Sequence, residues 1–576
     1  MSRQGDSPGS VAVQSRPSPE RLKFLSLFVL DISKSKPEEL HLSTIEQNDT
    51  TPAADVSLWL AIVPILVLIG LLGANVYLYG EDSSYGPNQI ALLMAAATAG
   101  LIGMIMKVPF ATMMQGVKTS ISSSVLAMLI LLLIGALTGT WMMSGVVPAM
   151  IYYGLDVLSP EYFLVAAATI CALVSVVTGS SWSTVATVGV ALLGIGNALG
   201  IHDGLIAGSV ISGAYFGDKI SPLSDTTNLA SAMAGAELIT HIRYMLWTTV
   251  PSFLIALAIF MFLGFNLELS ELATDNSALK EQIANRFNLN PVIFTVPALV
   301  LVLVLLRTDA VVALFVGALA GGIMAIVMQA DVVSGVAGWP VDKVATQENS
   351  EEMPSYFQRS YVALVNSMAY ETELVASKET DAFTLRKNEL AAALETQPDD
   401  VALQLEMQQV DAGLSAAKLL AGKGMAGMLN TVWLILTAMC FGGMMEACGL
   451  LQRITNSLIS FAKSDGSLVA TTAGSCVFVN VAAADQYLSI VVPGRMFRST
   501  FKQRGLAPEN LSRTLEDSGT VTSVLIPWNT CGAAQHAVLG VSVLAFAPYC
   551  FFNIISPLMT LLFAFIGIRI ARLAGK

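Results

Sequence analysis

The sequence predicts an all-α polytopic membrane protein, made of two repeat-related halves with discontinuous or re-entrant helices and carrying an inserted soluble helical hairpin. Charged residues are only 12% of 576 and the mean hydropathy is +0.66, whereas a soluble domain has about 25% charged residues. Apolar blocks long enough to cross a bilayer recur along the chain. Two polar-interrupted segments inside this apolar sequence, 213–230 and 515–534, nevertheless retain carboxylates. Because a carboxylate at membrane depth is costly, these segments are predicted to line an aqueous path.

The first 56 residues read as a polar N-terminal tail, rich in Ser, Pro, Gln and Glu. Its one apolar run, residues 22–30, has about ten residues, which cannot cross a hydrocarbon core about 30 Å thick. No small-residue cleavage site follows a hydrophobic core, as a signal peptide requires. We expect a cytoplasmic tail.

A first membrane half is predicted at 57–330 and a second at 425–576. The segments 179–221 and 468–534 are too polar for simple spans, so we expect re-entrant hairpins or unwound helices there. Together the chain should make roughly ten to thirteen crossings or half-crossings of about twenty residues each. The expected simple spans are 58–78, 89–106, 120–152, 163–177, 245–265, 291–306, 310–328, 429–450 and 543–568.

Basic residues set the expected orientation, because cytoplasmic loops carry an excess of Lys and Arg. Lys107 and Lys118 flank the loop after the second span, and further basic residues crowd 495–513 and the end of the chain. The loops at 81–84 and 156–161 carry acids and neither Lys nor Arg. We therefore expect both termini on the cytoplasmic side of a bacterial-type inner or plasma membrane.

The segment 331–424 is predicted to be an acidic, soluble, helical insertion. Residues 342–423 contain 14 Asp plus Glu against 7 Lys plus Arg. Apolar residues recur at helical spacing in 380–395 and 399–420, and the QPDD sequence between them indicates a helix stop followed by a helix start. The acidity favours the non-cytoplasmic side. A passive insertion and a regulatory or oligomerisation module are the two alternatives.

The two membrane halves are similar in layout. Residues 132–145 correspond to 434–449, and each is followed by a polar-punctuated stretch, 178–189 and 478–490. Each half then ends in one of the two acidic broken segments. A duplicated unit of this kind is typical of transporters, whose binding site lies at the repeat interface near the bilayer midplane. We expect the repeats to be inverted.

Four motifs occur in order along the chain: TGSSWSTVATVGVALLGIG, SGAYFGDKISPLSDTTNLA, ADQYLSIVVPGRMF and LSRTLEDSGTVTSVLIPWNTCGAA. On these motifs the chain resembles the NhaC-type Na⁺/H⁺ antiporter family of a wider ion-transporter superfamily, over about 57–328 and 425–568. Members include Na⁺/H⁺ exchangers and relatives that couple Na⁺ or H⁺ to malate/lactate exchange. The resemblance implies a secondary transporter rather than an enzyme. The acidic insertion and the N-terminal tail depart from the family pattern.

The first broken segment contains the oxygen ligands that a hard cation such as Na⁺ needs. Pro222 prevents an ordinary helix through it. A carboxylate removed from water can hold either a proton or a cation, and competition between the two would itself produce exchange. The oxygens belong to Asp218, Ser221, Ser224, Asp225, Thr226, Thr227 and Asn228.

Asp225 and Asp517 are the expected titrating residues and the expected Na⁺ ligands, with Asp218 next. Two alternatives give the first-segment acids a structural role. Asp218 could form an ion pair with the adjacent Lys219 at a helix end. Asp225 could instead cap the helix that begins at DTTNLA.

The second broken segment supplies further oxygens to the expected cage from Asp517, Thr520, Thr522 and Asn529. We expect its other acid, Glu516, to pair with Arg513 in the preceding basic loop.

Four residues outside the two segments are further candidates for the ion path. Asn480 and Asp485 flank three alanines that let backbone approach an ion closely, and Ser180 and Ser181 could expose hydroxyls and carbonyls at a helix break. The alternatives are an ion pair between Asp485 and Arg495, and helix packing through the small residues.

Other kinds of chemistry lack their characteristic residues. The histidines have no metal-site spacing, the cysteines form no CxxC, and no GxxxxGK[ST] phosphate loop occurs. No nucleophile and base are paired within the spans, so an enzyme is not expected. Neither a cofactor nor a nucleic-acid partner is expected.

We therefore expect a secondary active transporter that exchanges Na⁺ for H⁺ by alternating access and serves pH homeostasis. Its partners would be the lipid bilayer and the two transported ions, and a homodimer is an open alternative. The runner-up function is a Na⁺- or H⁺-coupled organic acid exchanger of the malate/lactate type. That function needs a cationic or helix-N-terminal anchor for the anion, for which Lys219 is the one buried-looking basic candidate.

Overall fold

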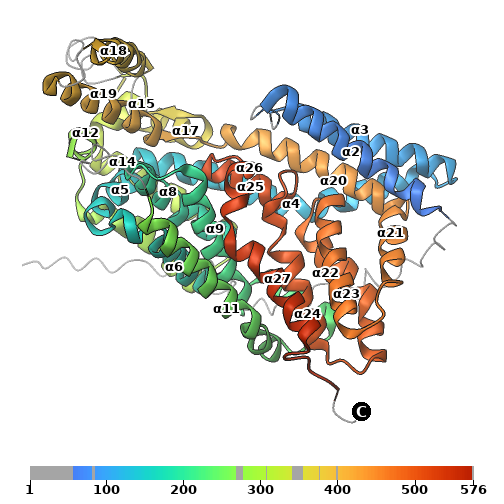
Figure 1. Cartoon of the computed structure of the whole chain (residues 1–576). Coiled ribbons are helices and arrows are strands. Elements are labelled where there is room, and N and C mark those ends of the chain that lie inside the picture. The colour runs from blue at the N-terminus through green and yellow to red at the C-terminus, as the bar shows by residue number, and fades with distance from the viewer. Residues whose placement is uncertain are drawn as a thin grey trace, which may run out of the picture. The chain divides into compact units, whose positions relative to one another are not determined.

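A computed structural model describes residues 56–80, 83, 85–267, 277–306, 308–339, 354–374, 377–396 and 400–573. The predicted N-terminal tail, apart from residue 56, lies outside the described residues. Within them the chain is helical apart from one pair of two-residue strands. The prediction of an all-α polytopic membrane protein is confirmed (Figure 1).

The helices fall into three groups along the chain. The first group is α2 Leu58–Tyr79, α3 Pro87–Ile105, α4 Phe110–Met143, α5 Val146–Val157, α6 Pro160–Thr178, α7 Ser181–Thr184, η3 Val185–Gly189, α8 Val190–Ala198, α9 Asp203–Ile220, α10 Asp225–Ala234, α11 Leu238–Phe265, α12 Ser277–Arg286, η5 Pro291–Phe294, α13 Thr295–Leu305, α14 Ala310–Met328 and α15 Ala330–Val336. The inserted group is α17 Tyr356–Ala369, β1 Thr372–Glu373, α18 Ser377–Thr396, α19 Val401–Leu419 and β2 Ala421–Gly422. The last group is η6 Ala426–Met428, α20 Leu429–Ala447, α21 Leu450–Ile459, α22 Asp465–Ala482, α23 Gln486–Gln503, α24 Pro508–Leu515, η7 Glu516–Thr520, η8 Ser523–Leu525, α25 Thr530–Leu539, α26 Val543–Phe546, η9 Ala547–Tyr549 and α27 Phe551–Ile566.

Seven of the described helices are long and apolar enough to cross a membrane, or nine if two bent pairs each count as one span. This is fewer than the ten to thirteen crossings or half-crossings predicted. Part of the difference lies in short elements such as α10, which has 10 residues and is counted in neither total. Ten residues rise about 15 Å, which is half of a hydrocarbon core.

The predicted helix breaks occur at the polar motifs. Helix α6 ends at Gly179, whose positive φ of 67° reverses the chain into α7, and α22 is followed in the same way by Ala484 with φ 57°. Helix α9 stops at Ile220, and Pro222 lies in the gap before α10. Helix α24 runs into the π-turn η7, after which regular helix resumes only at Thr530. Discontinuous helices are thereby confirmed.

Close packing of α6 on α9 fixes the first break in space. Gly213 and Gly217 of α9 lie directly against the carbonyls of Ala168 and Ala172 of α6, with no room for a Cβ atom. Small residues four apart on both helices allow this approach. Figure 1 shows α6, α9 and α11 side by side. The last turn of α9, which carries Asp218, is therefore held on a rigid helix pair.

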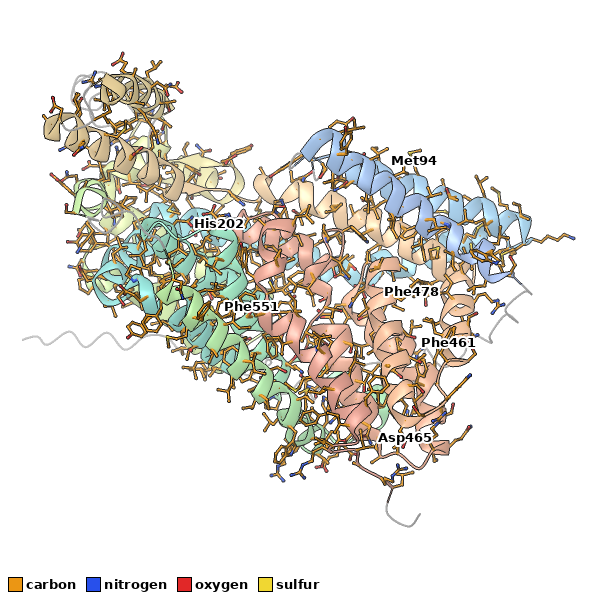
Figure 2. All side chains as sticks on the ribbon, in the orientation of Figure 1. Met94, His202, Phe461, Asp465, Phe478 and Phe551 are labelled. Carbon is orange, nitrogen blue, oxygen red and sulfur yellow. The ribbon has the colours of Figure 1, made fainter. Side chains whose placement is uncertain are left out.

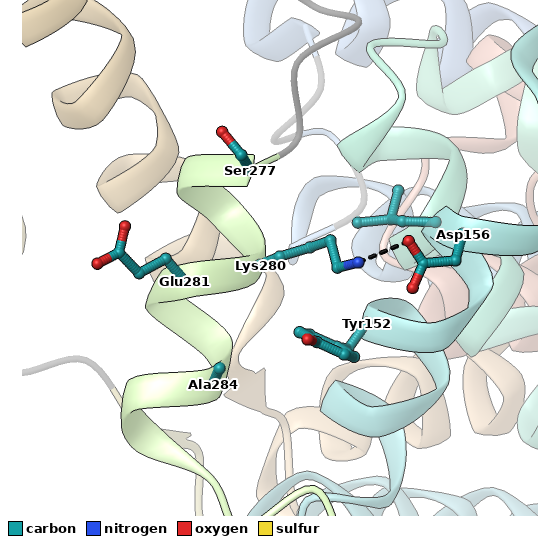
Figure 3. Close-up of a pocket in the computed structure, with 7 residues that line it drawn as sticks. Tyr152, Asp156, Ser277, Lys280, Glu281 and Ala284 are labelled. Carbon is teal, nitrogen blue, oxygen red and sulfur yellow. Dashed lines mark hydrogen bonds and ion pairs between the residues drawn. The ribbon is translucent and has the colours of Figure 1, made fainter.

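The insertion forms a hairpin of α18 and α19, closed at its base by antiparallel pairing of β1 with β2. Ion pairs join the two helices, Arg386 to Glu406 at 2.7 Å and Lys387 to Asp411 at 2.7 Å. Helix α12 also packs on α19. Between α5 and α12 lies a surface pocket of about 470 Å³, where Lys280 pairs with Asp156 at 2.6 Å (Figure 3).

The C-terminal segment, residues 567–573, ties four elements together. The amide of Ala507 donates to the carbonyl of Ala571 at 3.0 Å, ahead of α24. Arg572 pairs at 2.8 Å with Asp465, the first residue of α22 (labelled in Figure 2). The guanidinium of Arg569 lies 3.9 Å from the ring centroid of Trp247 on α11. These contacts hold the N-terminal end of α24, the helix whose C-terminal end continues into η7.

We predict that Gly217→Ala destabilises the protein by about 1–3 kcal/mol, because the added methyl group forces α9 away from α6. Gly73→Ala on α2 is the matched control, since nothing lies within 4 Å of the position its methyl group would occupy. The control should be neutral or slightly stabilising, as Ala is the better helix former. Thermal unfolding of both purified variants in detergent measures the difference, and equal unfolding temperatures would contradict the packing argument.

Candidate functional site

Asp218 lies in the last turn of α9 and is buried. Its Oδ2 accepts hydrogen bonds from the backbone amide of Ser181 at 3.1 Å and from the Ser181 hydroxyl at 2.7 Å. Ser181 is the first residue of α7, and Ser180 caps that helix by accepting from Ser183 N at 3.3 Å. The carboxylate thus faces a helix N-terminus, which favours negative charge. The predicted alternative, a pair between Asp218 and Lys219, is wrong, because Lys219 points elsewhere.

Lys219 pairs with Asp517 of η7, and both side chains are 0% exposed. The Lys219 ammonium also donates to Ser556 Oγ at 2.8 Å. The second carboxylate oxygen, Asp517 Oδ2, accepts from Thr248 at 2.9 Å and from Thr560. Four elements, α9, α11, η7 and α27, therefore meet at one neutralised pair. Asp517 has a hydrogen-bond donor at each of its oxygens, so a cation could bind it only by displacing one of these partners.

Glu516, the preceding residue, is also 0% exposed and forms no ion pair among the described residues. The Lys219 ammonium, which is paired with Asp517, still lies close enough to interact with Glu516 electrostatically. Its Oε1 accepts from Thr226 of α10 at 2.9 Å, whereas its Oε2 is buried without a hydrogen bond. The predicted pair with Arg513 is wrong. The Arg513 guanidinium lies 4.7 Å from the ring centroid of Tyr244 and donates to the carbonyl of Arg569 at 3.3 Å.

Hydroxyl groups surround the two unpaired carboxylates. The hydroxyls of Thr226 and Ser224 are 3.1 Å apart, and the buried hydroxyl of Thr520 also lies beside Glu516. Asp218 and Glu516 are close enough to interact electrostatically. The structure thus gathers carboxylate and hydroxyl oxygens from α9, α10 and η7, which is the ligand type that a hard cation requires.

Asp225 and Asp517 are not brought together. Asp225 is the first residue of α10 and its side chain is exposed. Ser224, rather than Asp225, caps this helix, so that predicted alternative is also wrong. Asn228 is exposed and donates to two backbone carbonyls, those of Pro222 at 3.0 Å and Ser224 at 2.8 Å. Asp225 does interact electrostatically with Asp218, so it lies near this buried acid.

Asn480 and Asn529 support the second break. Asn529 caps α25 by accepting from Cys531 N at 3.0 Å, and its amide donates to Asn480 Oδ1 at 3.2 Å. The amide of Asn480 donates to the carbonyl of Gly519 at 2.7 Å and to Thr522 Oγ1 at 3.1 Å. These bonds satisfy backbone and side-chain groups released where η7 unwinds.

Asp485 caps α23 and is buried. Its Oδ1 accepts from the amide of Leu488 at 2.9 Å. Among the ion pairs of the described residues, none joins Asp485 to Arg495, the predicted structural partner. Asp485 instead interacts electrostatically with Glu446, which is exposed in the last turn of α20.

Comparison with known proteins decides the family. A family model described as the Na⁺/H⁺ antiporter family matches residues 213–339 and 401–568, which include both broken segments. The chain belongs to this family. It is 34% identical to the Na⁺/H⁺ antiporter NhaC of Alkalihalophilus pseudofirmus over 84% of this chain and 91% of that protein, and 33% identical to NhaC of Bacillus subtilis over 83% and 92%. It is 28% identical to the malate-2H⁺/Na⁺-lactate antiporter of Bacillus subtilis over 84% and 90%.

As a member of the Na⁺/H⁺ antiporter family, the chain is an integral membrane protein and a secondary transporter, not an enzyme. The predicted family resemblance is confirmed, and with it the absence of a cofactor. The four sequence motifs correspond to the parts of the structure that meet around Asp218 and η7. Glu516 is the one acid of that cluster that was not predicted from the sequence to bind an ion. Its position inside a broken membrane helix is the sequence feature that could have indicated such a role.

We predict that Lys219→Met and Asp517→Leu each cost about 3–5 kcal/mol, because each leaves one buried charge without its partner. The double variant should recover most of this loss, since two apolar side chains leave no buried charge. Thermal unfolding of the purified variants measures the coupling.

The surface pair Lys280–Asp156, whose side chains are 23% and 57% exposed, provides a matched double-mutant cycle as the control. Surface pairs are worth about 0–1 kcal/mol, so its single variants should change stability little. Equal losses in both cycles would contradict the assignment of the buried pair.

Proposed function

We propose that this chain exchanges Na⁺ for H⁺ across the membrane, with Asp218 and Glu516 as the carboxylates for which the two ions compete. The observation that carries the proposal is the carboxylate of Glu516, which is fully buried, forms no ion pair among the described residues and leaves one oxygen without a hydrogen bond there. The nearby Lys219 ammonium is already paired with Asp517. A buried charge of this kind is expensive unless an ion or a proton compensates it.

The chemistry follows from charge. Two ionised carboxylates close together repel each other, and either a proton or a cation on one of them relieves the repulsion. Na⁺ would take its oxygens from Asp218 and Glu516 and from the hydroxyls of Ser224, Thr226 and Thr520. Binding of one ion therefore displaces the other, so that Na⁺ moving in one direction is coupled to H⁺ moving in the opposite direction.

In this proposal Asp225 attracts cations, whereas Asp517 has a structural role. Asp225 is exposed and acidic, so it attracts cations towards Asp218. Asp517 supplies the counter-charge for Lys219 and fixes the position of η7. Ser180 and Ser181 hold Asp218 against the N-terminus of α7, and Asn480, Asn529 and Asp485 stabilise the second break.

For the transport cycle we propose alternating access, with the two broken segments moving between states. Its support is that the two halves repeat the same order of features. In each, a helix reverses at a residue with positive φ, Gly179 or Ala484, and the next helix is capped by a polar side chain, Ser180 or Asp485. A broken helix then follows. This order is what a duplicated unit predicts, and the inversion of the repeats and the cytoplasmic termini remain part of the proposal.

An organic acid exchanger is the second candidate, favoured by the likeness to the malate-2H⁺/Na⁺-lactate antiporter. An anion would need a positive partner in the site. Lys219, the predicted anchor, is neutralised by Asp517, which weighs against this candidate.

We predict that Asp218→Asn and Glu516→Gln each reduce Na⁺-dependent proton flux at least about tenfold, the loss expected when about 1.4 kcal/mol of ion stabilisation is removed. Asp225→Asn should chiefly raise the Na⁺ concentration needed for half-maximal flux. Glu161→Gln, at an exposed acid in the first turn of α6, is the control and should transport normally. The measurement is dissipation of a pH gradient by NaCl in everted vesicles that contain equal amounts of each variant. Full flux in both Asp218→Asn and Glu516→Gln would refute the proposed site.

The same vesicles separate the two candidate functions. We expect NaCl alone to dissipate the gradient between pH 7 and 9, and malate or lactate to add nothing, because the buried ammonium is already paired. A response to NaCl that appears only when one of the organic acids is present would move the protein to the exchanger class.

A further inference from the structure

Helix α17 has its polarity reversed relative to a helix on a water-facing surface. The side chains that face the protein are small or hydroxylic: Ser360, Ala363 and Ser367. Four of the five exposed side chains of the helix are large and mostly apolar: Phe357 (81% exposed), Tyr361 (64%), Val362 (41%) and Val365 (40%). The fifth is Gln358, in the first turn. In water, the opposite arrangement would be the stable one. The outward face of α17 is therefore built for an apolar environment.

The position of α17 supports this reading. The Tyr356 hydroxyl donates at 2.6 Å to the carbonyl of Ile326, in the last turn of α14. Leu364 lies against Gly322 of α14, and the carbonyl of Ser367 lies against Gly139 of α4. Gly322 is six residues from the end of α14, which corresponds to about 9 Å along its axis. Because α4 and α14 are both membrane spans by length and composition, α17 lies level with their final turns.

The apolar surface of α17 continues onto the outward face of α14. Ile323 and Val327 are 61% and 72% exposed there. They border a groove of about 330 Å³ between α13 and α14. The groove is lined by Val292, Thr295, Val296, Leu299, Ala320, Ile323, Met324, Val327 and Met328. Eight of these nine side chains are apolar, as expected for a surface in contact with acyl chains.

The hairpin that follows α17 differs in character. Its surface carries charged side chains that are 41–65% exposed and paired with one another, including Arg386, Glu389 and Glu406. Such a surface needs water. The change from apolar to charged exposure occurs between α17 and α18.

We propose that α17 is an interfacial helix whose outward face lies at the boundary between headgroups and acyl chains, so that its partner is the lipid bilayer. Aromatic side chains are enriched at this depth, and interfacial helices bury their apolar face about 5–10 Å into it. The segment 331–424, predicted to be a soluble insertion, then has two parts. Helix α17 anchors it in the membrane surface, and the hairpin of α18 and α19 stands in water.

A second copy of the chain fits this face less well. Helix α17 has 14 residues and is about 21 Å long, whereas a specific protein interface needs to bury roughly 1,000 Å² or more with good complementarity. Continuity with the outward surfaces of α13 and α14 also favours lipid, because those surfaces belong to membrane helices.

The test is spin-label accessibility in the full-length protein in lipid nanodiscs. Nitroxides are introduced through Phe357→Cys, Tyr361→Cys and Val365→Cys, one at a time, with Leu385→Cys on α18 as the water-facing control. Leu385 is 66% exposed, comparable to the test positions. Unmodified protein taken through the same labelling gives the background from the six native cysteines.

We expect the ratio of oxygen to nickel-chelate accessibility to be severalfold higher at the three α17 positions than at 385, because oxygen partitions into lipid and the chelate stays in water. Nickel accessibility equal to that at 385 would overturn the proposal by showing a water-facing helix. Low accessibility to both reagents would also overturn it, by showing that protein covers the face. Three positions keep the test decisive if one variant fails to insert.

Discussion

The buried ion pair between Lys219 and Asp517 is the constraint on which the core of this protein depends. An isolated ammonium or carboxylate at membrane depth is unfavourable by several kcal/mol, and the two side chains relieve each other. Their pairing joins α9 to η7, while Thr248 and Thr560 bring in α11 and α27. The two broken segments, far apart in the chain, are held in one place by this contact.

The pairing of Lys219 with Asp517 limits the interaction partners that remain for the neighbouring acids, Asp218 and Glu516. Asp218 precedes Lys219 on the same turn but is directed to α7, where the backbone amide and the hydroxyl of Ser181 donate hydrogen bonds to it. Glu516 precedes Asp517 but faces α10. Neither acid forms an ion pair among the described residues, although the paired Lys219 ammonium interacts electrostatically with Glu516. The proposed function assigns the remaining charge of these buried acids to a bound proton or cation. In a transporter of the Na⁺/H⁺ antiporter family, protons and sodium ions are the available species.

The sequence was sufficient to locate the breaks but not to pair their side chains. Local backbone conformation depends directly on residue types such as Pro222, the glycine at 179 and the clustered Ser and Thr residues. The helix breaks occur where these residues predicted them. Proximity in the sequence does not determine which side chains form an ion pair. The predicted pairs, Asp218 with Lys219 and Glu516 with Arg513, join residues one and three positions apart. The pair that forms joins residues 298 positions apart. Only the tertiary fold makes that pair available, and its formation leaves Glu516 as the unpaired acid.

The π-turn η7 explains how adjacent residues can have opposite roles. A widened turn inside a helix changes the direction of each following side chain, and such turns are frequent at functional sites. Here Glu516 is directed to the hydroxyls of α10, and Asp517 to the ammonium of α9. Because Asp517 is bound at both oxygens, it anchors the turn, and the anchored turn in turn holds the unsatisfied oxygen of Glu516 in position. In the proposed function, the fixed charge of Asp517 therefore supplies the rigidity that keeps the adjacent Glu516 carboxylate available to an exchangeable ion.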